Sequence, residues 1–497
     1  MTTDSALFTD FYELTMAQGF WKNNMNHKAI FDMFFRRQPF GGGFSIFAGL
    51  ETFLEALGGF RFSPEDIGYL ETLGLFERGF LDYLSHFRFS GNIWAMKEGS
   101  VVFPQEPLIR VEAGMIEAQL IEGMLLNTIN FQSLVATKTA RVWLASNRAS
   151  IMEFGLRRAQ GPDGAMSATR AAYIGGATST SNTLAGRRFG IPVMGTMAHS
   201  WIMAFPSERE AFECYAKTYP DRSVFLLDTY DTLKSGLPNA IEVGRKLVAA
   251  GKNFGVRLDS GDMDYLSVEV RKALDAAGLK DATITVSNEL DESIVRTLVA
   301  AGAPIDSWGV GTQMVTGGND PAFTGVYKLA AHENSKGSLV PAMKFSDNPE
   351  KTTNPGVKQV WRLTDSEGKA IADVMGLVAP EGFTLAAGTD GSDAPLEHEK
   401  VEQGVGRSFW HPSVDYRHFH TAPEGLVIPL LEQRFKKGKV LGPHPDLKSI
   451  RSHVREELDR FDGSYLRLLN PHGYKVAITE KLKDLKLGLI QSYLGDM

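Results

Sequence analysis

The stretch Phe254-Gly255-Val256-Arg257-Leu258 is a short, mainly apolar run, and it passes directly into the polar cluster Asp259-Ser260-Gly261-Asp262. Continuous apolar runs of this length are typical of parallel strands that are buried on both faces. Similar runs, most of them followed by polar residues, lie before and after it in the chain. They span Ser150–Phe154, Ile191–Gly195, Ser223–Leu227, Thr283–Val286 and Ser307–Val310, with Val326–Leu329 as a further candidate.

The segments between these runs carry helix signals. Three of them end in Ala-Ala-Gly, at Gly251, Gly278 and Gly302, where glycine suits a helix end that needs a positive φ. The repeat spacing of roughly 25–30 residues matches β-α units, whose strands run parallel. Such units form either a barrel or a doubly wound sheet. In a barrel, the polar clusters at the strand ends would lie on the face that carries the chemistry.

The rest of the chain has a different pattern. We expect a first helix over Asp10–Asn23 and a small β domain around Ile93–Ile109. Gly41-Gly42-Gly43 lacks the Lys-Ser/Thr that follows in a P-loop, so a plain turn is the better interpretation. Residues 331–360 are polar and predict a long loop. A charged helix is predicted over Asp446–Phe461 in the C-terminal part.

Composition narrows the class of protein. The chain has 497 residues, of which 43% are hydrophobic and 22% charged, so it is globular and large enough for two to four domains at ~150 residues each. The single cysteine, Cys214, cannot form an internal disulfide. No secretory leader is visible at the start, and no apolar run reaches the ~18 residues of a membrane span. A net charge of -7 argues against a nucleic-acid coat. We therefore expect a cytoplasmic protein that binds neither nucleic acid nor membrane.

Several strand ends carry groups suited to a phosphorylated sugar. Arg157-Arg158 could bind phosphate oxygens, although a solvated pair is the commoner fate of two arginines. The loop Gly175–Asn182 could wrap an anion or could only cap a helix. Gly309-Val310-Gly311-Thr312 permits close backbone approach to a phosphate, or forms a tight turn. His199 follows another run, and a lone histidine is more often a packed residue than a catalyst.

Charged pairs follow two of the runs. Asp228 and Asp231, like Asp259 and Asp262, are three residues apart and could hold Mg²⁺ or ribose hydroxyls, or could cap helices. Arg257 lies inside a predicted strand, so it needs an anionic partner. That partner could be structural, such as Asp228, or a ligand carboxylate. Together, the clusters fit a sugar-phosphate ligand with Mg²⁺ better than capping alone.

These motifs resemble those of the nicotinate phosphoribosyltransferase family, in the same order and along most of the chain. The opening Thr9–Met16 is similar to that family's first signature. The remaining similar stretches are Glu153–Arg158, Gly175–Gly186, Gly195–Ser200, Asp228–Asp231, Gly255–Asp262, Gly309–Thr316 and Met343–Gly356.

The resemblance implies an activity and a fold. Family members condense nicotinate with phosphoribosyl pyrophosphate to nicotinate mononucleotide and pyrophosphate, for NAD biosynthesis. ATP is a co-substrate, and its hydrolysis is coupled through a phosphohistidine that matches His199. The implied fold is α/β, an irregular (β/α) barrel over 136–345 with an N-terminal α+β domain over 1–135. A C-terminal extension over 346–497 packs partly with the N-terminal domain. The implied assembly is a homodimer with shared active sites.

The resemblance also assigns roles to residues. Tyr12 of a neighbouring subunit would stack on the pyridine ring opposite Phe154, and Arg257 with Thr196 would face the nicotinate carboxylate. Arg157 would lie near phosphate. Asp228, Asp259 and Asp262 would hold ribose hydroxyls or Mg²⁺, and Asp259 and Asp262 would act with His199 in catalysis. The other substrate-binding residues would be Asn182, Ser287, Asn288, Gly311 and Thr312.

Other interpretations stay open at this point. Nicotinamide phosphoribosyltransferases carry an aspartate where this chain has Asn182, and an ionised aspartate would repel a carboxylate substrate, so Asn182 favours the acid. Quinolinate phosphoribosyltransferases are shorter and lack the histidine motif. Met197 departs from the family pattern, where a polar residue or histidine is expected.

Three further alternatives have less support. A non-enzymatic metabolite-binding protein would have no need for His199 and the aspartates. An isomerase or aldolase barrel would want a Schiff-base lysine, and only Lys328 is so placed. A zinc site at His411, His418 and His420 lacks a cysteine or glutamate at metal spacing, so structural or surface histidines are the better interpretation.

Overall fold

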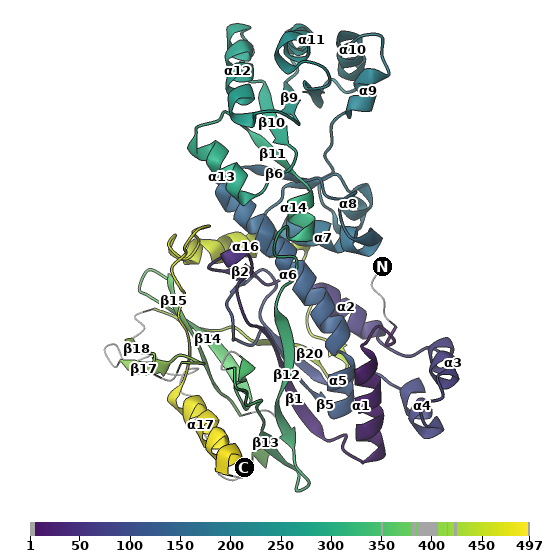
Figure 1. The fold of residues 1–497 in the computed structure, drawn as a ribbon, viewed down its shortest axis with the longest axis vertical. Helices are drawn as coiled ribbons and strands as arrows, with labels where there is room; N and C mark the ends of the chain where they lie inside the picture. The colour runs from purple at the N-terminus through teal and green to yellow at the C-terminus, as the bar shows by residue number, and fades with distance from the viewer. Residues whose placement is uncertain are drawn as a thin grey trace. The chain divides into compact units, whose positions relative to one another are not determined.

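A computed structural model describes the chain at residues 5–348, 351–379, 384–385, 406–414, 416–421 and 425–495. It contains two compact units (Figure 1). The first combines the residues up to Leu134 with those from Ala322 onward, and the second is Val135–Pro321. The chain passes between the units twice, within the long helix α6, Glu122–Ala145, and again between Pro321 and Ala322. The three domains expected from the resemblance divide the chain differently and stay a prediction.

The second unit is built on a six-stranded sheet in which every neighbouring pair is parallel, in the order β7-β6-β11-β10-β9-β8. Because the strands are parallel, their carboxyl ends meet at one edge. The strands are β6 (Ser150–Glu153), β7 (Ser179–Thr180), β8 (Ser223–Leu226), β9 (Phe254–Leu258), β10 (Thr283–Ser287) and β11 (Ser307–Val310).

Helices follow the strands in the manner of β-α units. The longest are α7 (Gly161–Gly175), α10 (Glu208–Thr218), α11 (Leu237–Ala249), α12 (Met263–Ala276) and α13 (Glu292–Ala300). Shorter helical turns are α8 (Thr183–Phe189), α9 (His199–Met203), η2 (Thr232–Gly236) and α14 (Thr312–Thr316). The predicted glycine ends of α11, α12 and α13 are confirmed, since Gly251, Gly278 and Gly302 have φ of +72°, +79° and +76°.

Five of the six predicted parallel strands are confirmed, two of them with unchanged bounds. The prediction for Ile191–Gly195 is wrong, because this segment forms only an isolated bridge between Val193 and Thr180. Pro192 lacks the N–H that a strand would donate, and residues 192–195 are exposed. The strand that takes the edge position is the short β7. Its Ser/Thr-rich sequence has no apolar run to reveal it.

The first unit is organised by an eight-stranded, mostly antiparallel sheet in the order β16-β13-β12-β1-β5-β3-β20-β21. In β1 (Lys28–Phe35), every residue after Lys28 is buried. Helices α1, α2, α4 and α5 supply apolar side chains to the same core. The other strands are β3 (Asn92–Ala95), β5 (Ile109–Gly114), β12 (Gly325–Glu333), β13 (Ser338–Pro341), β16 (Thr384–Leu385), β20 (Glu432–Lys436) and β21 (Lys439–Val440). The helices are α1 (Phe11–Lys22), α2 (Leu50–Gly59), α3 (Pro64–Thr72), α4 (Arg78–Ser85) and α5 (Met115–Leu120).

A second sheet of the first unit has the order β18-β17-β22-β15-β14-β19. Its strands are β14 (Lys358–Thr364), β15 (Ala370–Leu377), β17 (Arg407–Trp410), β18 (His418–Thr421), β19 (Val427–Pro429) and β22 (Val476–Ile478). The unit also contains the strand pair β2 (Ser45–Ile46) and β4 (Val101–Val102), the turn η1 (Pro39–Gly41), and the helices α16 (Leu447–Arg460) and α17 (Glu480–Gly495). Within the described part of the chain, no helix has the length and apolar character needed to cross a membrane.

Local predictions for the first unit have mixed outcomes. The first helix and the charged helix after Asp446 are confirmed. The segment Ile93–Ile109 is rich in strands as expected, but it is not a small domain of its own, because β3 and β5 belong to the eight-stranded sheet and β4 pairs with β2. Val326–Leu329 is a strand, but it lies in β12 and pairs antiparallel with β1 instead of extending the parallel sheet. The long loop predicted for 331–360 is wrong, since β12 runs on to Glu333 and β13 and the start of β14 follow. β12 and β13 pair with each other as a hairpin, and their polar sequences lack the apolar runs by which the other strands were predicted.

A buried ionic network joins several elements of the first unit. Arg362 on β14 donates through Nη2 to Asp373 at 2.7 Å and through Nη1 to Glu457 at 2.6 Å, with its side chain 1% exposed. It also donates to the carbonyl of Val101 at 2.8 Å. The Tyr474 hydroxyl donates to Asp373 at 3.0 Å. The network therefore ties β14, β15, α16 and the β4 strand to one cation.

Candidate functional site

The centre of the candidate site is Arg257, which stands on β9 one residue before its carboxyl end. Its Nε donates to the Ser287 hydroxyl at 2.8 Å, its Nη1 to the Thr196 hydroxyl at 2.9 Å, and its Nη2 to Asp259 at 2.6 Å. The Phe154 ring lies 5.8 Å from the guanidinium carbon. The predicted anionic partner of this arginine is therefore Asp259, and it is not Asp228.

The hydrogen-bond inventory of Arg257 leaves a fork unused. A guanidinium has five N–H groups, and three of them are occupied here. Among the described residues no other acceptor meets them, so one N–H remains on each terminal nitrogen. One free N–H on each of the two terminal nitrogens is suited to the two oxygens of a carboxylate. The arrangement can bind a planar carboxylic acid beside the ring of Phe154.

Asp259 is held in its ionised form. Burial raises its pKa, but the hydrogen bond from Ser287 and the charge of Arg257 outweigh burial, so the pKa of Asp259 lies below its ordinary value. Its second carboxylate oxygen faces Nε2 of His199 at 3.8 Å. Asp259 is therefore a permanent anion at neutral pH that connects the arginine to the histidine.

His199 is the first residue of the short helix α9, and its side chain is 42% exposed. Its Nδ1 lies 3.1 Å from the Thr229 hydroxyl, and its Nε2 faces Asp259. A contact on each ring nitrogen sets the ring orientation. An accessible imidazole between a hydroxyl and a carboxylate is suited to accepting a proton or an electrophilic group.

Asp228 has one oxygen committed and one available. Oδ2 accepts a hydrogen bond from Ser260, whereas Oδ1 is buried and has no hydrogen-bond partner among the described residues. A buried carboxylate oxygen without a partner fits a ribose hydroxyl or a divalent cation. Asp262 instead caps α12 by accepting from the backbone N–H groups of Asp264 and Tyr265.

The donors for a metal are sparse. In the part of the chain that the structure describes, no group of three His, Cys, Asp or Glu side chains could hold an ion. Mg²⁺ in phosphate-transfer sites commonly takes one or two carboxylates, with the rest from substrate oxygens and water. The single free oxygen of Asp228 fits that pattern.

The backbone of β11 comes close to neighbouring side chains at Gly309, near the end of the strand. A Cβ added to Gly309 would lie 2.8 Å from the Phe154 ring and 3.1 Å from the Cβ of Ser287. Glycine at this position therefore lets Phe154 lie against the sheet edge. Gly311 and Thr312 follow at the start of α14.

The buried carboxylate of Glu153 fixes the carboxyl end of β6 through hydrogen bonds. Glu153, the last residue of β6, is 1% exposed and accepts from Thr169 at 3.0 Å and from Thr180 at 2.6 Å. Asn182 caps α8 through its Oδ1, and its Nδ2 donates to Thr169 at 3.2 Å. The Asn182 amide is thus hydrogen-bonded at both ends within the protein.

The remaining predicted residues lie around this centre or in the other unit. Arg157 is exposed in the turn after β6, and Asn288 follows β10 with a φ of +104°, a strained conformation for a residue with a side chain. Met197, the departure from the family pattern, is 4% exposed and packs into the interior. Tyr12 belongs to the first unit, on α1, and is 46% exposed.

Tyr12 has its own acidic surroundings. Burial and the nearby carboxylate of Glu122 raise the pKa of Tyr12, so its hydroxyl stays protonated and hydrogen-bonds to Glu122. Burial likewise raises the pKa of Glu13 to about 8.

Two residues of the site were not among the predictions. Thr229 orients His199, and Ser260 holds Asp228. Each is the chain neighbour of a predicted aspartate, and that adjacency is the only signal the sequence offers for them.

Comparison with known proteins identifies the family. Residues 7–130 match the nicotinate phosphoribosyltransferase N-terminal domain, 149–367 match the nicotinate phosphoribosyltransferase family, and 357–486 match its C-terminal domain. Nicotinate phosphoribosyltransferase of Bacillus subtilis is 41% identical over 481 residues, which cover 96% of this chain and 93% of that protein. This chain belongs to the nicotinate phosphoribosyltransferase family. The human member is 34% identical over 538 residues, covering 96% and 95% of the two chains.

The fold agrees with the family. The crystal structure of human nicotinic acid phosphoribosyltransferase superimposes with a TM-score of 0.80 at 31% identity, over 97% of this chain and 99% of that one. The predicted α/β class and irregular barrel are thereby confirmed. Nicotinate-nucleotide pyrophosphorylase from Pyrococcus furiosus shares the fold, with a TM-score of 0.67 at 20% identity.

Proposed function

We propose that this protein condenses nicotinate with phosphoribosyl pyrophosphate to nicotinate mononucleotide and pyrophosphate, as a step of NAD biosynthesis. The observation that carries the proposal is the unused N–H fork of Arg257 beside the Phe154 ring. A pyridine carboxylic acid has a flat ring and a carboxylate in one plane, which matches this pair. The names of the curated relatives support the same substrate.

The chemistry asks the protein for alignment and charge stabilisation. The lone pair of the pyridine nitrogen forms a bond to C1 of the ribose, while the C1–O bond breaks and its electrons leave with pyrophosphate. The transition state has oxocarbenium character, so a fixed ring and excluded water lower the barrier. Arg257 and Thr196 orient the carboxylate, and Phe154 supports one ring face. Gly311, Thr312 and the Ser287–Asn288 turn supply the phosphoribosyl pocket.

Asp228 is the residue suited to hold Mg²⁺, through its unpartnered Oδ1. When bound, the ion would neutralise phosphate charge on the substrate. The Ser260 hydroxyl holds the other oxygen of Asp228 in place. Asp262 caps the helix that follows, α12. Tyr12 of a second copy would close the pyridine site in a homodimer.

Coupling to ATP would run through His199. With its proton on Nδ1, directed to Thr229, the lone pair of Nε2 attacks the terminal phosphorus of ATP and ADP leaves. Hydrolysis of the phosphohistidine later returns inorganic phosphate. The accessible ring supports this role.

One assay tests the proposed reaction. Purified protein is incubated with phosphoribosyl pyrophosphate, Mg²⁺ and either nicotinate or nicotinamide, with and without ATP, and the mononucleotide is quantified by chromatography. Preferred turnover of nicotinate supports the proposal. Preferred turnover of nicotinamide would show that the substrate is the amide and not the acid. No turnover of either would favour a non-enzymatic binding protein.

His199→Ala is expected to abolish stimulation by ATP while leaving the ATP-independent rate within about twofold, because the histidine touches the coupling step and not the glycosidic bond. The measurement is mononucleotide formation with and without ATP, together with acid-labile labelling from γ-³²P-ATP. His86→Ala, at an exposed histidine of the first unit, is the matched control. Labelling that persists in the His199 variant would refute the phosphohistidine.

Asp228→Asn is expected to raise the Mg²⁺ concentration needed for half-maximal rate by about 10- to 100-fold, because the amide cannot supply the anionic oxygen. The measurement is initial rate against Mg²⁺ at saturating substrates. Asp231→Asn is a control, because the side chain of Asp231 is committed to capping η2 and to an exposed ion pair with Lys234. An unchanged Mg²⁺ dependence with a lower maximal rate would assign Asp228 to the ribose instead.

A further inference from the structure

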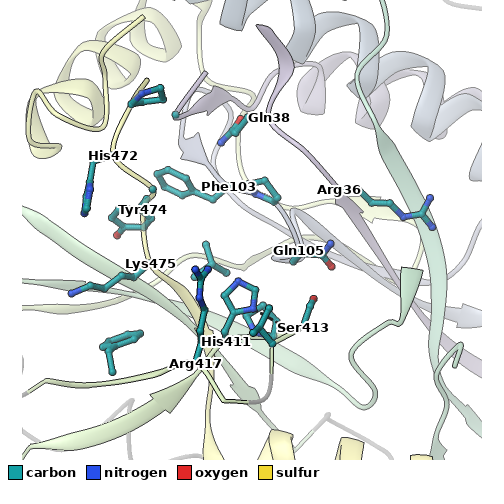
Figure 2. A pocket seen from close by; sticks show the side chains of 18 of the residues that line it. Arg36, Gln38, Phe103, Gln105, His411, Ser413, Arg417, His472, Tyr474 and Lys475 are labelled. Atoms are coloured by element: carbon teal, nitrogen blue, oxygen red, sulfur yellow. Dashed lines mark hydrogen bonds between the residues drawn. The ribbon is translucent and has the colours of Figure 1, made fainter. Parts of the chain in front are cut away.

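A large cavity lies wholly within the first unit, away in sequence from every strand end that forms the candidate site. Its volume is about 1030 Å³, and its walls come from the β1 and β4 ends, the β17–β18 connection and the segment before β22. The volume is at the upper end of the range for small-molecule sites. Figure 2 shows the side chains that line it.

The described lining is cationic and contains no Asp or Glu. Arg417 and Lys475 contribute permanent charges, and His411, His418 and His472 add imidazoles. Neither Arg417 nor Lys475 has an ion pair with any described residue. Arg36 also lines the cavity, but its side chain is directed away from the His411–Arg417 group (Figure 2). Lys475 likewise extends away from that group, and its Nζ lies 5.2 Å from the centroid of the Phe419 ring (Figure 2).

Hydrogen bonds fix the part of the cavity wall around His411. Buried Lys486 donates to the carbonyl of Pro412 at 2.6 Å and to Asn354 at 3.0 Å, which holds the turn in place. The backbone N–H of Ser413 donates to Nδ1 of His411 at 3.1 Å, so the ring proton is on Nε2. Burial and the charges of Arg417 and Lys486 lower the pKa of His411, so it is a neutral donor at neutral pH.

The aromatic side of the cavity is equally fixed. Phe103 and Tyr474 stack with ring centroids 4.0 Å apart, and the Tyr474 hydroxyl is tied to Asp373. Gly43 packs against this region so closely that a Cβ would lie 2.2 Å from the carbonyl oxygen of Tyr465. In Figure 2 the Arg417 guanidinium and the His411 ring turn toward this aromatic wall.

We propose that this cavity binds a small molecule carrying two or more phosphate groups, with Arg417, Lys475 and His411 as the phosphate-binding side chains. An arginine fork, an ammonium and a neutral imidazole N–H together suit the many oxygens of a polyphosphate. No carboxylate of a described residue neutralises Arg417 or Lys475, and Lys475 has only the Phe419 ring beside its ammonium, so a bound anion would stabilise both cations. Both a nucleoside polyphosphate and an inorganic polyphosphate have this chemistry. The inference goes beyond the proposed reaction, since none of its residues takes part in it.

The test is equilibrium binding to the full-length protein, without turnover. Tripolyphosphate, ATP and adenosine are titrated by calorimetry into Arg417→Gln/Lys475→Gln and into the charge-matched control Lys336→Gln/Lys448→Gln, whose lysines are exposed elsewhere in the first unit. We expect the affinity of one class of sites for tripolyphosphate and ATP to fall by about tenfold or more in Arg417→Gln/Lys475→Gln, and to stay unchanged in the control variant. Equal binding to ATP and tripolyphosphate indicates that the phosphates alone are recognised, whereas stronger ATP binding adds a base contact.

Photolabelling with 8-azido-ATP locates the site independently. Adducts are expected within 411–419 or 471–476, suppressed by tripolyphosphate, in addition to any at the second unit. Equal affinities of the two variants, or adducts confined to the second unit, would overturn the proposal. Basal mononucleotide formation should be unchanged in Arg417→Gln/Lys475→Gln. A failure of that reaction in every protein would contradict the proposed function and leave the binding result standing.

Discussion

Arg257→Gln is expected to lower kcat/KM for nicotinate by about 10²- to 10³-fold. The glutamine cannot offer two parallel N–H groups, so the substrate carboxylate would lose its charged partner in a partly buried site, a loss of about 3–4 kcal/mol. The side chain of Arg257 is only 13% exposed, so water cannot readily replace it. The measurement is steady-state kinetics with nicotinate as the varied substrate.

Two comparisons separate carboxylate binding from general damage. In Arg257→Gln, any turnover of nicotinamide should fall much less than the turnover of nicotinate. Arg257→Lys keeps the positive charge but cannot offer N–H groups on two nitrogens, so it should retain only part of the activity. Removing Arg257 also removes a charge that lowers the pKa of Asp259, so this pKa rises and the acid limb of the pH–rate profile moves to higher pH. Equal losses for both substrates would place Arg257 in a structural role.

Arg362→Leu is expected to destabilise the first unit by about 3–5 kcal/mol, because it leaves the carboxylates of Asp373 and Glu457 buried without their cation. The measurement is urea unfolding followed by circular dichroism. A surface pair offers the contrast. Arg209 pairs with Glu213 and Glu242, and all three side chains are well exposed, so Arg209→Leu should change stability by less than about 1 kcal/mol.

The double variant Arg362→Leu/Asp373→Leu supplies the decisive comparison. It removes the cation together with one of the stranded anions, so it should be more stable than Arg362→Leu alone. If the single and double variants unfold at the same urea concentration, the loss would come from packing and not from uncompensated charge.

Much of the second unit was predictable from local pattern. Phe254–Leu258 and Ser307–Val310 are strands with the predicted bounds, because strands buried on both faces need continuous apolar runs. Gly251, Gly278 and Gly302 end helices as expected, because they adopt a positive φ that other residues avoid. Ile191–Gly195 has the same apolar character but forms only an isolated bridge with Thr180, and Pro192 has no N–H to donate to a ladder.

The site was predictable as a set of residues, but not as a set of contacts. The residues that the family resemblance brought forward include Arg257, Thr196, Ser287 and Asp259, and the structure joins them by hydrogen bonds. The carboxylate that pairs with Arg257 is Asp259, whereas the example suggested by the sequence was Asp228. Asp262 is occupied as a helix cap, and Asp228 keeps the free oxygen.

By itself, the sequence determined the parallel β-α repeat and the polar character of its strand ends, because both depend on residues adjacent in the chain. Tertiary structure alone decided that Val326–Leu329 joins an antiparallel sheet, that Arg257 keeps one N–H on each terminal nitrogen, and that Arg417 and Lys475 face one cavity. The physical reason is the same in each case. Strand pairing, hydrogen-bond saturation and cavity lining depend on groups far apart in sequence, which only the folded chain brings together.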